Sequence, residues 1–420
     1  MLLSMKVVHV VRRLVEEEWG GAEAVLYNYC VRLARLGFEA PVFATAALSR
    51  PGPDNVRGLE IERFRYFYPF LFLSAKARLL MDKKGGSPVS FAMYRRIRRE
   101  DDLSLVHLHA MGRLGATVRT ACKRRGIPYV VSLHGGHFTI PPEEHALFQK
   151  PAKGTLCYGK PFGLLLGIRK ILKDAAAILS VGRAEHLKVR ERYPEQAVYL
   201  PNGVDTGRFA QGVGERFREK HNLRDRKIIL CLSRIDPQKG QLYLVQALPE
   251  ILKKVPEAFL VLVGSSTIES YRRQILDTIA REKLEDKTLM ISQLAPDSDD
   301  LLDAYAACDV FSLPSIHEPF GIVVLEAWAA SRPVVASRIG GIPHFVDDGE
   351  NGLLCEPGDL GGLTENLIRV LSDRELAERL GRSGCEKACR SYDWDVIVKR
   401  LTRIYEKVIS GEPVAEAEHP

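Results

Sequence analysis

The stretch His317-Glu318-Pro319-Phe320-Gly321-Ile322-Val323-Val324-Leu325-Glu326 decides the fold of this chain. It follows an apolar run, Val310-Phe311-Ser312-Leu313, that is typical of a buried strand, and it leads into residues that favour a helix. Pro319 and Gly321 mark the start of that helix. The stretch therefore predicts a strand, a short loop and a helix in succession, the pattern of an α/β sheet.

Two carboxylates flank the predicted helix start. Glu318 lies in the loop, and Glu326 falls roughly two turns on, about 12 Å along the axis if the whole interval is helical. The unpaired N–H groups of a helix start lie between them and attract phosphate. This arrangement suits a ligand with hydroxyls at both ends and a phosphate in the middle, as in a nucleotide sugar.

The bulk composition is that of a globular protein with two or three domains. The 420 residues are 46% hydrophobic and 27% charged. No apolar run approaches the roughly 18 residues of a membrane span, and Val7–Val11 is too short for a signal-peptide core. Eight scattered cysteines favour a reducing compartment over a disulfide scaffold. We therefore expect a cytoplasmic protein.

The net charge of +7 is unevenly distributed along the chain. Residues 1–200 carry a balance of +14, and residues 201–420 a balance of −7. The first half is therefore expected to meet an anionic partner. A phosphorylated acceptor or an anionic membrane surface is favoured over nucleic acid, because the basic residues form no recognisable nucleic-acid motif.

The first half opens with a βαβ pattern. A predicted strand, Lys6–Val11, is followed by Gly20-Gly21, a helical pattern that ends at Gly37, and a second predicted strand, Phe38–Thr45. A glycine pair at a helix start lets the backbone approach a ligand closely.

Histidines stand at the ends of two later predicted strands. Leu105–His109 and Tyr129–His134 end in His109 and His134, and ligand sites of parallel sheets lie beyond such strand ends. We expect His134, which precedes two glycines, to be functional, and we assign His107 a structural role. For His109 both a functional and a structural role are open.

Two segments of the first half leave the α/β pattern. Residues 64–100 combine an aromatic run with a cluster of arginines. They are either a helical excursion packed on the sheet or an element that binds acceptor or membrane. Residues 138–170 are rich in Pro and Gly, and we interpret them as a lid over the cleft.

The second half contains two cations five residues apart. Arg234 and Lys239 lie in a predicted strand-to-helix loop after Ile228–Leu232. One interpretation is that they bind a diphosphate, the arginine through the paired N–H groups of its guanidinium and the lysine as a point charge. The alternative is that both are ordinary solvent-exposed bases.

Taken in order, these motifs resemble those of the family 4 glycosyltransferases, and the resemblance covers nearly the whole chain. The residues that carry it are Gly20-Gly21-Ala22-Glu23, Pro201-Asn202-Gly203-Val204-Asp205, Ser233-Arg234, Lys239-Gly240, Pro314-Ser315, Glu318-Pro319-Phe320-Gly321, Glu326-Ala327 and Gly340-Gly341-Ile342-Pro343.

The resemblance implies the GT-B fold, an α/β fold in which two Rossmann-like domains with parallel sheets face each other across a cleft. Residues 1–200 would bind the acceptor, and residues 201–390 the nucleotide sugar. A C-terminal helix over 391–410 would pack back on the first domain, and we expect a disordered tail over 411–420.

The resemblance also implies a retaining, metal-independent transfer of a hexosyl unit from a nucleoside-diphosphate sugar, GDP-mannose or a UDP-hexose. The acceptor would be a glycan, a lipid-linked or a phosphorylated compound, in the synthesis of cell-surface polysaccharide or glycolipid. No cofactor is expected beyond the donor substrate, and the protein would be cytoplasmic or peripheral on the inner face of the membrane.

Site roles follow from the same resemblance. Glu326 would bind the ribose and Glu318 the donor sugar, while Arg234 and Lys239 would neutralise the departing diphosphate. His134 would bridge to the reacting sugar. The remaining donor contacts would come from Gly20, Gly21, Phe320, Gly321, Ile322 and the region of Leu294, which contacts the base.

Three departures from the family pattern leave the base and the sugar open. Gln293 stands where a strand-end glycine is expected beside Leu294, His344 stands where the family has Glu, and Ser331 where Gly is common. The triplet Asp297-Ser298-Asp299 matches a D-x-D metal motif, but helix capping explains it better.

Two other functions remain as alternatives. A nucleotide-sugar epimerase of the same fold would isomerise or hydrolyse its ligand rather than transfer a sugar. A catalytically silent sugar- or lipid-binding subunit would keep the fold but lose the cations and the carboxylates.

Overall fold

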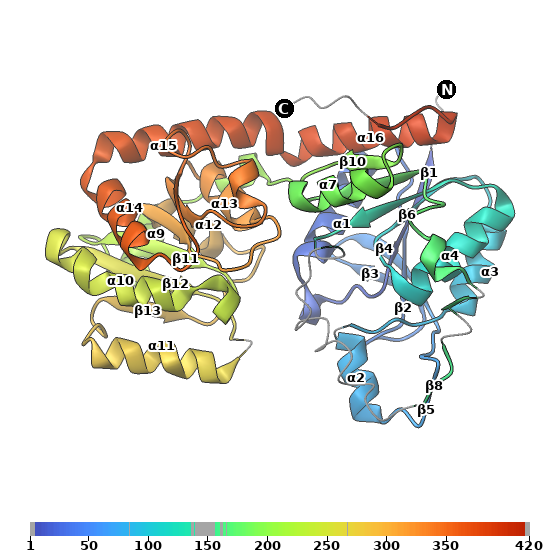
Figure 1. Cartoon of the computed structure of the whole chain (residues 1–420), viewed down its shortest axis with the longest axis horizontal. Helices are drawn as coiled ribbons and strands as arrows, with labels where there is room; N and C mark the ends of the chain where they lie inside the picture. The colour runs from blue at the N-terminus through green and yellow to red at the C-terminus, as the bar shows by residue number, and fades with distance from the viewer. Residues whose placement is uncertain are drawn as a thin grey trace. The chain divides into compact units, whose positions relative to one another are not determined.

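The computed structural model describes residues 5–83, 85–135, 138, 156–159, 163–164, 166–266 and 268–415. By its internal contacts the chain divides into two compact units (Figure 1). The first comprises Met1–Pro201 with Val398–Pro420, and the second comprises Asn202–Ile397. Among the described residues, none of the helices is both long enough and apolar enough to pass through a bilayer.

The first unit is built on an eight-stranded sheet in the order β10-β9-β7-β6-β1-β2-β4-β3. Neighbouring strands are parallel except β3 and β4, which are antiparallel. The strands are β1 (Lys6–Val11), β2 (Val42–Thr45), β3 (Gly52–Val56), β4 (Leu59–Phe64), β6 (Leu103–Leu108), β7 (Tyr129–Leu133), β9 (Ala177–Ser180) and β10 (Ala197–Tyr199).

Helices cover both faces of this sheet, because alternate residues of a strand point to opposite sides. Val8 and Val10 of β1 pack into one cluster with α3 and α4, and Val11 packs into another with α1. The described helices of the unit are α1 (Gly21–Arg35), α2 (Ala75–Lys83), α3 (Phe91–Arg99), α4 (Gly112–Arg125), α7 (Arg183–Arg192) and the short η1 (Glu16–Glu18) and η3 (Ile168–Lys170).

The second unit has a six-stranded, parallel sheet in the order β13-β12-β11-β14-β15-β16. Ile228 and Leu230 of β11 pack on one face, and Ile229 and Cys231 on the other. The strands are β11 (Lys227–Leu232), β12 (Ala258–Val263), β13 (Thr288–Ile291), β14 (Val310–Leu313), β15 (Val334–Ser337) and β16 (Leu353–Cys355).

The helices of the second unit complete its two layers. They are α8 (Thr206–Phe209), α9 (Gly214–Lys220), η4 (Pro237–Lys239), α10 (Gln241–Lys254), α11 (Glu269–Arg281), α12 (Asp299–Ala307), α13 (Ile322–Ala329), η5 (Ile342–His344), α14 (Leu360–Ser372), α15 (Arg374–Lys387) and the π-helical η6 (Ala388–Tyr392). Helix α16 (Trp394–Ser410) follows, and its residues from Val398 on belong to the first unit.

Each sheet has one point where the strand order reverses. In the first unit the chain adds β2 on one side of β1 and later returns to place β6 on the other. In the second it adds β12 beside β11 and later places β14 on the opposite side. Ligands of open α/β sheets bind beyond the carboxyl ends of the strands at such switch points. The topology therefore marks one candidate site in each unit.

Several expected boundaries differ in the structure. The strand expected over Phe38–Thr45 begins only at Val42, and the strand expected to end in Leu294 stops at Ile291. Ser298 caps α12, accepting a hydrogen bond from the Leu301 amide, as the capping interpretation of the D-x-D triplet predicted. The disorder expected over 411–420 does not extend to Val414, which is buried. The lid expected over 138–170 lies mostly outside the described residues.

Candidate functional site

The candidate site of the second unit begins with the loop after β11. Arg234 is exposed there, and its carbonyl accepts a hydrogen bond from the buried side chain of Gln241. Gly240 ends the loop with a φ of +71°, and a Cβ atom on it would overlap the carbonyl oxygen of Pro314. Only glycine allows this approach. The loop after β11 is thereby brought against the loop after β14.

This approach places Lys239 beside Glu318. The Lys239 Nζ lies 2.6 Å from the Glu318 Oε2, with the two side chains 15% and 8% exposed. A charge-assisted hydrogen bond with so little water around it is stronger than one at the surface. Two of the predicted site residues, 79 positions apart in the sequence, thus meet at the switch point of the sheet.

Glycines also determine how Glu318 enters the site. Gly321 caps α13 with a φ of +97°, so the helix begins at Ile322, directly after the two residues that were predicted to mark its start. Gly340 has a φ of +59°, and a Cβ atom on it would overlap the Glu318 carbonyl. The amide of Gly341 donates to that same carbonyl at 3.0 Å. The backbone of Glu318 is therefore held by the loop after β15, and the interval from Glu318 to Glu326 is only partly helical.

Glu326 lies in the second turn of α13 and pairs with a residue that sequence reasoning missed. The hydroxyl of Tyr305, on α12, donates to the Glu326 Oε2 at 2.6 Å. Burial raises the pKa of Glu326, while the hydrogen bond from Tyr305 and the positive charge of Arg208 act in the opposite direction. The sequence gives no functional signal for Tyr305, because a tyrosine near the end of an amphipathic helix is typical of the hydrophobic core.

The other predicted donor contacts lie around the same helix start. Phe320 is buried, and Ile322 and Leu294 are half-buried against the same apolar cluster. The structure therefore brings Lys239, Glu318, Gly321 and Glu326 to one region, with Leu294, in the loop after β13, packed against the same apolar cluster.

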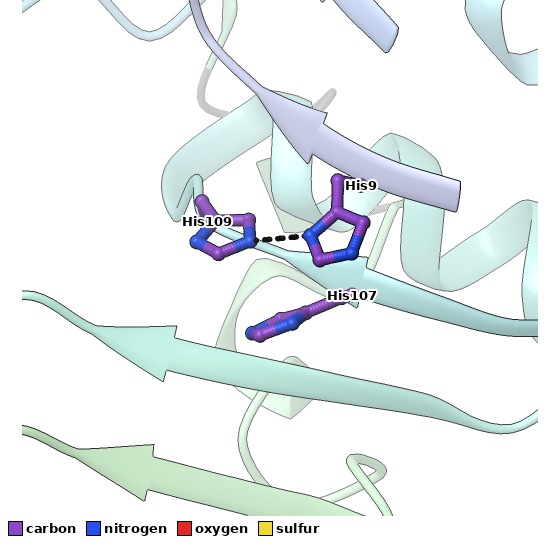
Figure 2. A group of neighbouring side chains, drawn as sticks. All are labelled: His9, His107 and His109. Carbon is purple, nitrogen blue, oxygen red and sulfur yellow. Dashed lines mark hydrogen bonds between the residues drawn. The ribbon is translucent and has the colours of Figure 1, made fainter. Parts of the chain in front are cut away.

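The candidate site of the first unit is an array of histidines. The Nδ1 of His109 lies 2.9 Å from the Nε2 of His134, and the Nε2 of His109 lies 3.1 Å from the Nδ1 of His9. Figure 2 shows His9 and His109 joined by this second hydrogen bond, with the ring of His107 beside them. Sequence reasoning missed His9, because its position opposite His107 depends on the register of β1 and β6.

These rings are uncharged at neutral pH. Burial lowers the pKa of His9 to about 3 and that of His134 to about 4, and it holds the pKa values of His107 and His109 well below 6.5. A neutral imidazole donates from one nitrogen and accepts at the other. The tautomer of His134 is consequently coupled through His109 to that of His9.

His107 has partners of its own. Its Nδ1 lies 2.5 Å from the hydroxyl of Tyr405 on α16, and its Nε2 lies 2.7 Å from the hydroxyl of Ser132. All three groups are buried. These contacts agree with the structural role expected for His107, and they attach α16 to the sheet of the first unit.

His9, His107 and His109 also satisfy the spacing of a metal-ligand set, since one ring nitrogen of each lies within 4.8 Å of the others. The donor geometry does not fit a metal ion. The rings of His107 and His109 stack with centroids 4.0 Å apart at 28°, and lone pairs in the planes of stacked rings do not converge on one point. Both nitrogens of His107 are already hydrogen-bonded. We interpret His9, His109 and His134 as a hydrogen-bonded array, with the ring of His107 stacked on that of His109.

Gly20 and Gly21 form the start of α1, as expected. Gly20 caps the helix in extended backbone, and both glycines are exposed. A Cβ atom on Gly20 would lie 3.1 Å from a carboxylate oxygen of Glu23. A cavity of about 420 Å³ opens beside this helix start, lined by Glu23, His109 and two arginines that sequence reasoning did not single out, Arg12 and Arg13.

Comparison with known families matches both units. The model described as "Glycosyl transferases group 1" matches residues 213–387, and the model described as "Glycosyltransferase Family 4" matches residues 19–208. The first match contains Lys239, Glu318 and Glu326, and the second contains Gly20 and His134.

Curated relatives are similar over half to nine tenths of the chain. A GDP-mannose-dependent alpha-(1-6)-phosphatidylinositol monomannoside mannosyltransferase of Mycolicibacterium smegmatis is 33% identical over 56% of this chain and 64% of its own length. A D-inositol 3-phosphate glycosyltransferase of Corynebacterium efficiens is 30% identical over 57% and 59%. An uncharacterized glycosyltransferase of Methanocaldococcus jannaschii is 27% identical over 89% and 91%. The matches to the first two span less than two thirds of those relatives.

Solved structures show the same architecture. HepE of Anabaena, in complex with UDP and glucose, has a TM-score of 0.71 at 20% identity, covering 96% of this chain and all of that one. Sucrose-phosphate synthase from Thermosynechococcus elongatus has a TM-score of 0.70 at 21% identity, covering 97% of this chain and all of that one. These likenesses confirm the predicted GT-B fold.

Proposed function

Since the chain belongs to the group 1 glycosyltransferases, we propose that it transfers a hexosyl unit from a nucleoside-diphosphate sugar to a glycan, lipid-linked or phosphorylated acceptor. The donor is GDP-mannose or a UDP-hexose. The mannosyltransferase of Mycolicibacterium smegmatis is GDP-mannose-dependent by name, and a protein of the same fold was solved with UDP and glucose. Synthesis of cell-surface polysaccharide or glycolipid is the corresponding setting.

One observation supports this proposal most strongly. Lys239, Glu318 and Glu326 gather around the start of α13, at the switch point of the second sheet. A cation, two carboxylates and the N–H groups of a helix start match three of the four parts of a nucleotide sugar, namely the diphosphate, the sugar and the ribose.

The roles of the residues follow from their positions. The amides of Gly321 and Ile322 would hold phosphate, Lys239 and the exposed Arg234 would neutralise the departing diphosphate, and Glu318 would bind the sugar hydroxyls. The Lys239 ammonium group has three N–H donors, so it would donate to the phosphate as well as to Glu318. Preorganised charges of this kind stabilise a leaving diphosphate without waiting for water to reorient.

Glu326 is suited to the ribose because it is only half-buried and already oriented. Tyr305 holds one of its oxygens, which leaves the other to accept from ribose hydroxyls. Leu294 would contact the base. In the first unit, Gly20, Gly21 and His134 would approach the reacting sugar.

We further propose that the transfer is retaining and independent of metal. Lys239 and Arg234 supply the positive charge that a divalent cation would otherwise provide. The retaining course is tested by following the anomeric configuration of the first-formed product by NMR. An inverted product would contradict it.

The acceptor side of the proposal includes an anionic membrane surface. Phe72 is 91% exposed, and Leu79 and Leu80 of α2 are 49% and 45% exposed beside the exposed bases Lys76 and Arg78. Figure 1 shows α2 grouped with β5 (Phe70–Leu71) and β8 (Leu156–Cys157) at one end of the first unit. Apolar and basic side chains on one projecting element suit the interface of anionic lipids.

This peripheral association is tested with liposomes at low salt. We expect binding to vesicles that contain anionic lipid and weaker binding by Phe72→Ser combined with Leu79→Ser. A protein that ignores such vesicles and efficiently glycosylates a soluble acceptor would contradict the membrane part of the proposal and leave the transferase part standing.

The donor site is tested by screening UDP-, GDP- and ADP-sugars for hydrolysis and for protection against thermal unfolding. Arg234→Ala and Glu326→Ala are expected to lose that protection while staying folded, because both side chains line a ligand site. The matched control is Arg224→Ala, an exposed arginine of the same unit paired only with Glu219 among the described residues. Unchanged protection in both site variants would overturn the assignment.

The same screen separates the alternatives. A nucleotide-sugar epimerase would convert the donor without any acceptor, and a silent binding subunit would bind it without turnover. The paired Lys239 and Glu318 favour a catalytic site, since a silent subunit has no need of a buried ion pair at a helix start.

A further inference from the structure

A cavity of about 420 Å³ lies at the switch point of the first unit, where β1 and β6 end. Arg12 and Arg13 follow β1 directly, Glu23 comes from the first turn of α1, and His109 and Met111 follow β6. The walls therefore combine two guanidinium groups, one carboxylate and one imidazole. Such a cavity has the size of a small polar ligand.

Arg13 is the least satisfied of these groups. Its side chain is only 11% exposed, with the Nη1 3.2 Å from the Glu18 Oε2. Within the described part of the chain, its Nε and Nη1 have no acceptor at hydrogen-bond geometry. A nearly buried guanidinium with unmet donors is costly unless a ligand completes it. Glu18 also pairs with Lys83, so its charge is shared.

Hydrogen bonds to backbone carbonyls fix the position of the Arg12 guanidinium. It donates to the backbone carbonyls of Met81, at 3.2 Å, and Asp82, at 2.6 Å. Burial lowers the pKa of Arg12, which means that its positive charge lacks the solvation it has in water. An anion in the cavity would restore that stabilisation.

The start of α4 adds to the same wall. Gly112 begins this 14-residue helix with a φ of +71°, and Met111, at the capping position, offers no side-chain cap. The hydroxyl of Ser87 accepts from the amide of Arg113 at 2.8 Å. The positive end of the helix dipole thus faces the cavity beside the arginines.

We propose that this cavity binds the acceptor by a phosphate or phosphodiester group on a polyol, with Arg13 as the direct contact to the phosphate. Arg12 and the start of α4 add positive charge, while the Glu23 carboxylate accepts hydrogen bonds from the polyol hydroxyls. The inference rests on the proposed transferase function and specifies the acceptor class for it.

The anion is assigned to the acceptor rather than to the donor because the donor has its own cations. Lys239 and Arg234 belong to the second unit, whose switch point carries the carboxylates for ribose and sugar. The first half of the chain, with a charge balance of +14, contains the cavity. A donor diphosphate held by Lys239 would leave Arg13 unsatisfied.

The test measures binding of glycerol 3-phosphate, inorganic phosphate and glycerol to the full chain by calorimetry, with and without nucleotide. We expect both phosphates to bind and glycerol not to bind. Arg13→Gln is expected to weaken phosphate binding at least tenfold while donor-sugar hydrolysis and nucleotide binding stay as in the wild type. Arg13→Lys should recover part of the loss, because it keeps the charge without the fork.

Arg35→Gln is the matched control, an exposed arginine at the far end of α1. It removes the same charge and should leave phosphate binding unchanged. If Arg13→Gln fails to fold, Met111→Trp serves instead, since it fills the cavity and should exclude glycerol 3-phosphate more than inorganic phosphate.

The outcomes separate this inference from the proposed function. Equal phosphate binding by the wild type and Arg13→Gln, or loss of nucleotide binding in Arg13→Gln, would overturn the acceptor assignment. Donor hydrolysis without any phosphate binding would overturn the inference alone, and no donor binding at all would overturn the proposed function.

Vesicles distinguish the two sources of the phosphate. If the acceptor is a lipid, Arg13→Gln should bind phosphatidylglycerol vesicles more weakly than Arg35→Gln does, with phosphatidylcholine vesicles as the neutral reference. If the acceptor is a soluble phosphate, the two variants should bind vesicles alike and differ only with glycerol 3-phosphate.

Discussion

The two units place their sites at the same point of a similar sheet but fill them with different chemistry. The second unit presents a charged pair, Lys239 and Glu318, and a half-buried carboxylate, Glu326. The first presents neutral imidazoles, of which His9 has a pKa lowered to about 3. The sheet topology therefore determines where each site lies. The charge of the group that a site binds determines which residue types are suited to it.

The proposed departure of a diphosphate would account for the charged site. Its negative charge develops at the leaving oxygen, and only fixed cations or amide groups offset it. The neutral histidine array is suited to a different task, the orientation of the His134 ring. Its coupled hydrogen bonds fix that ring without placing a positive charge beside the proposed sugar. His134 is thereby held by His109 and, through it, by His9.

The largest effect is expected from Lys239→Ala. Removing the cation should lower donor turnover by about 10²–10³-fold, the usual cost of losing a preorganised charge from a transition state. Steady-state kinetics with the preferred donor gives the measurement. Lys220→Ala, which breaks an exposed ion pair with Asp300 in the same unit, is the control. If both variants turned over equally, the charged site would not be the donor site.

The next largest effect is a pH dependence of the first unit. The pKa values of His9 and His134 in the folded state, about 3 and about 4, lie below the unfolded value of 6.5. Between those values the unfolded state binds more protons than the folded state. The contribution of the two histidines to stability is therefore fully present above pH 6.5. It is lost as the pH falls to about 4 for His134 and to about 3 for His9. The slope is about 1.4 kcal/mol per pH unit for each histidine.

Hydrogen exchange of β1 and β6 at pH 7 and pH 5 measures this loss, with β11 and β14 as the internal reference. His134→Gln should flatten the dependence, because it removes one of the titrating rings. Equal acid sensitivity of both sheets in the wild type would mean that the array is not what separates the two units.

In the second unit we expect a smaller pH dependence of stability with the opposite sign. Burial raises the pKa of Glu326, so its ionisation costs stability as the pH rises above the unfolded pKa. Glu326→Gln should therefore raise the thermal midpoint by a few degrees at pH 7, about 1 kcal/mol, while nucleotide binding weakens. Tyr305→Phe, which removes the hydroxyl that orients the carboxylate, should weaken nucleotide binding without that gain. A lower midpoint for Glu326→Gln would contradict the prediction.

The smallest expected effect is that of metal removal. In the proposed donor site Lys239 and Arg234 would provide the positive charge for the diphosphate, so EDTA should leave donor turnover unchanged. Turnover that fell with EDTA and recovered with Mg²⁺ would show that the site needs a divalent cation and would end the metal-independent interpretation.

Much of the second unit could be predicted from local sequence. Its strands are short apolar runs, and Pro319 and Gly321 are strong local signals, although the helix starts one residue after Gly321. Lys239 and Glu318 were identified because each lies directly beside a glycine or a proline, and Glu326 because it falls roughly two turns after Glu318. Tyr305 was not, because its hydroxyl meets Glu326 only when α12 and α13 pack together.

The first unit shows where local sequence is insufficient. His109 and His134 were identified as strand ends, but His9 lies in the middle of a strand, and Arg12 and Arg13 look like ordinary loop bases. Their relation depends on β1 lying between β2 and β6 in a particular register. Strand order and register are long-range properties, and no local pattern encodes them.

The sequence by itself therefore determined the α/β elements, the glycines that end loops, and the charges available to a donor. These depend on backbone conformation and side-chain chemistry, which act over a few residues. The tertiary structure alone decided that Lys239 meets Glu318, that four histidines form one neutral array, and that Arg13 lines a cavity with unmet donors. Those outcomes depend on strand order and burial, because only packing removes water from a polar group and brings distant residues into contact.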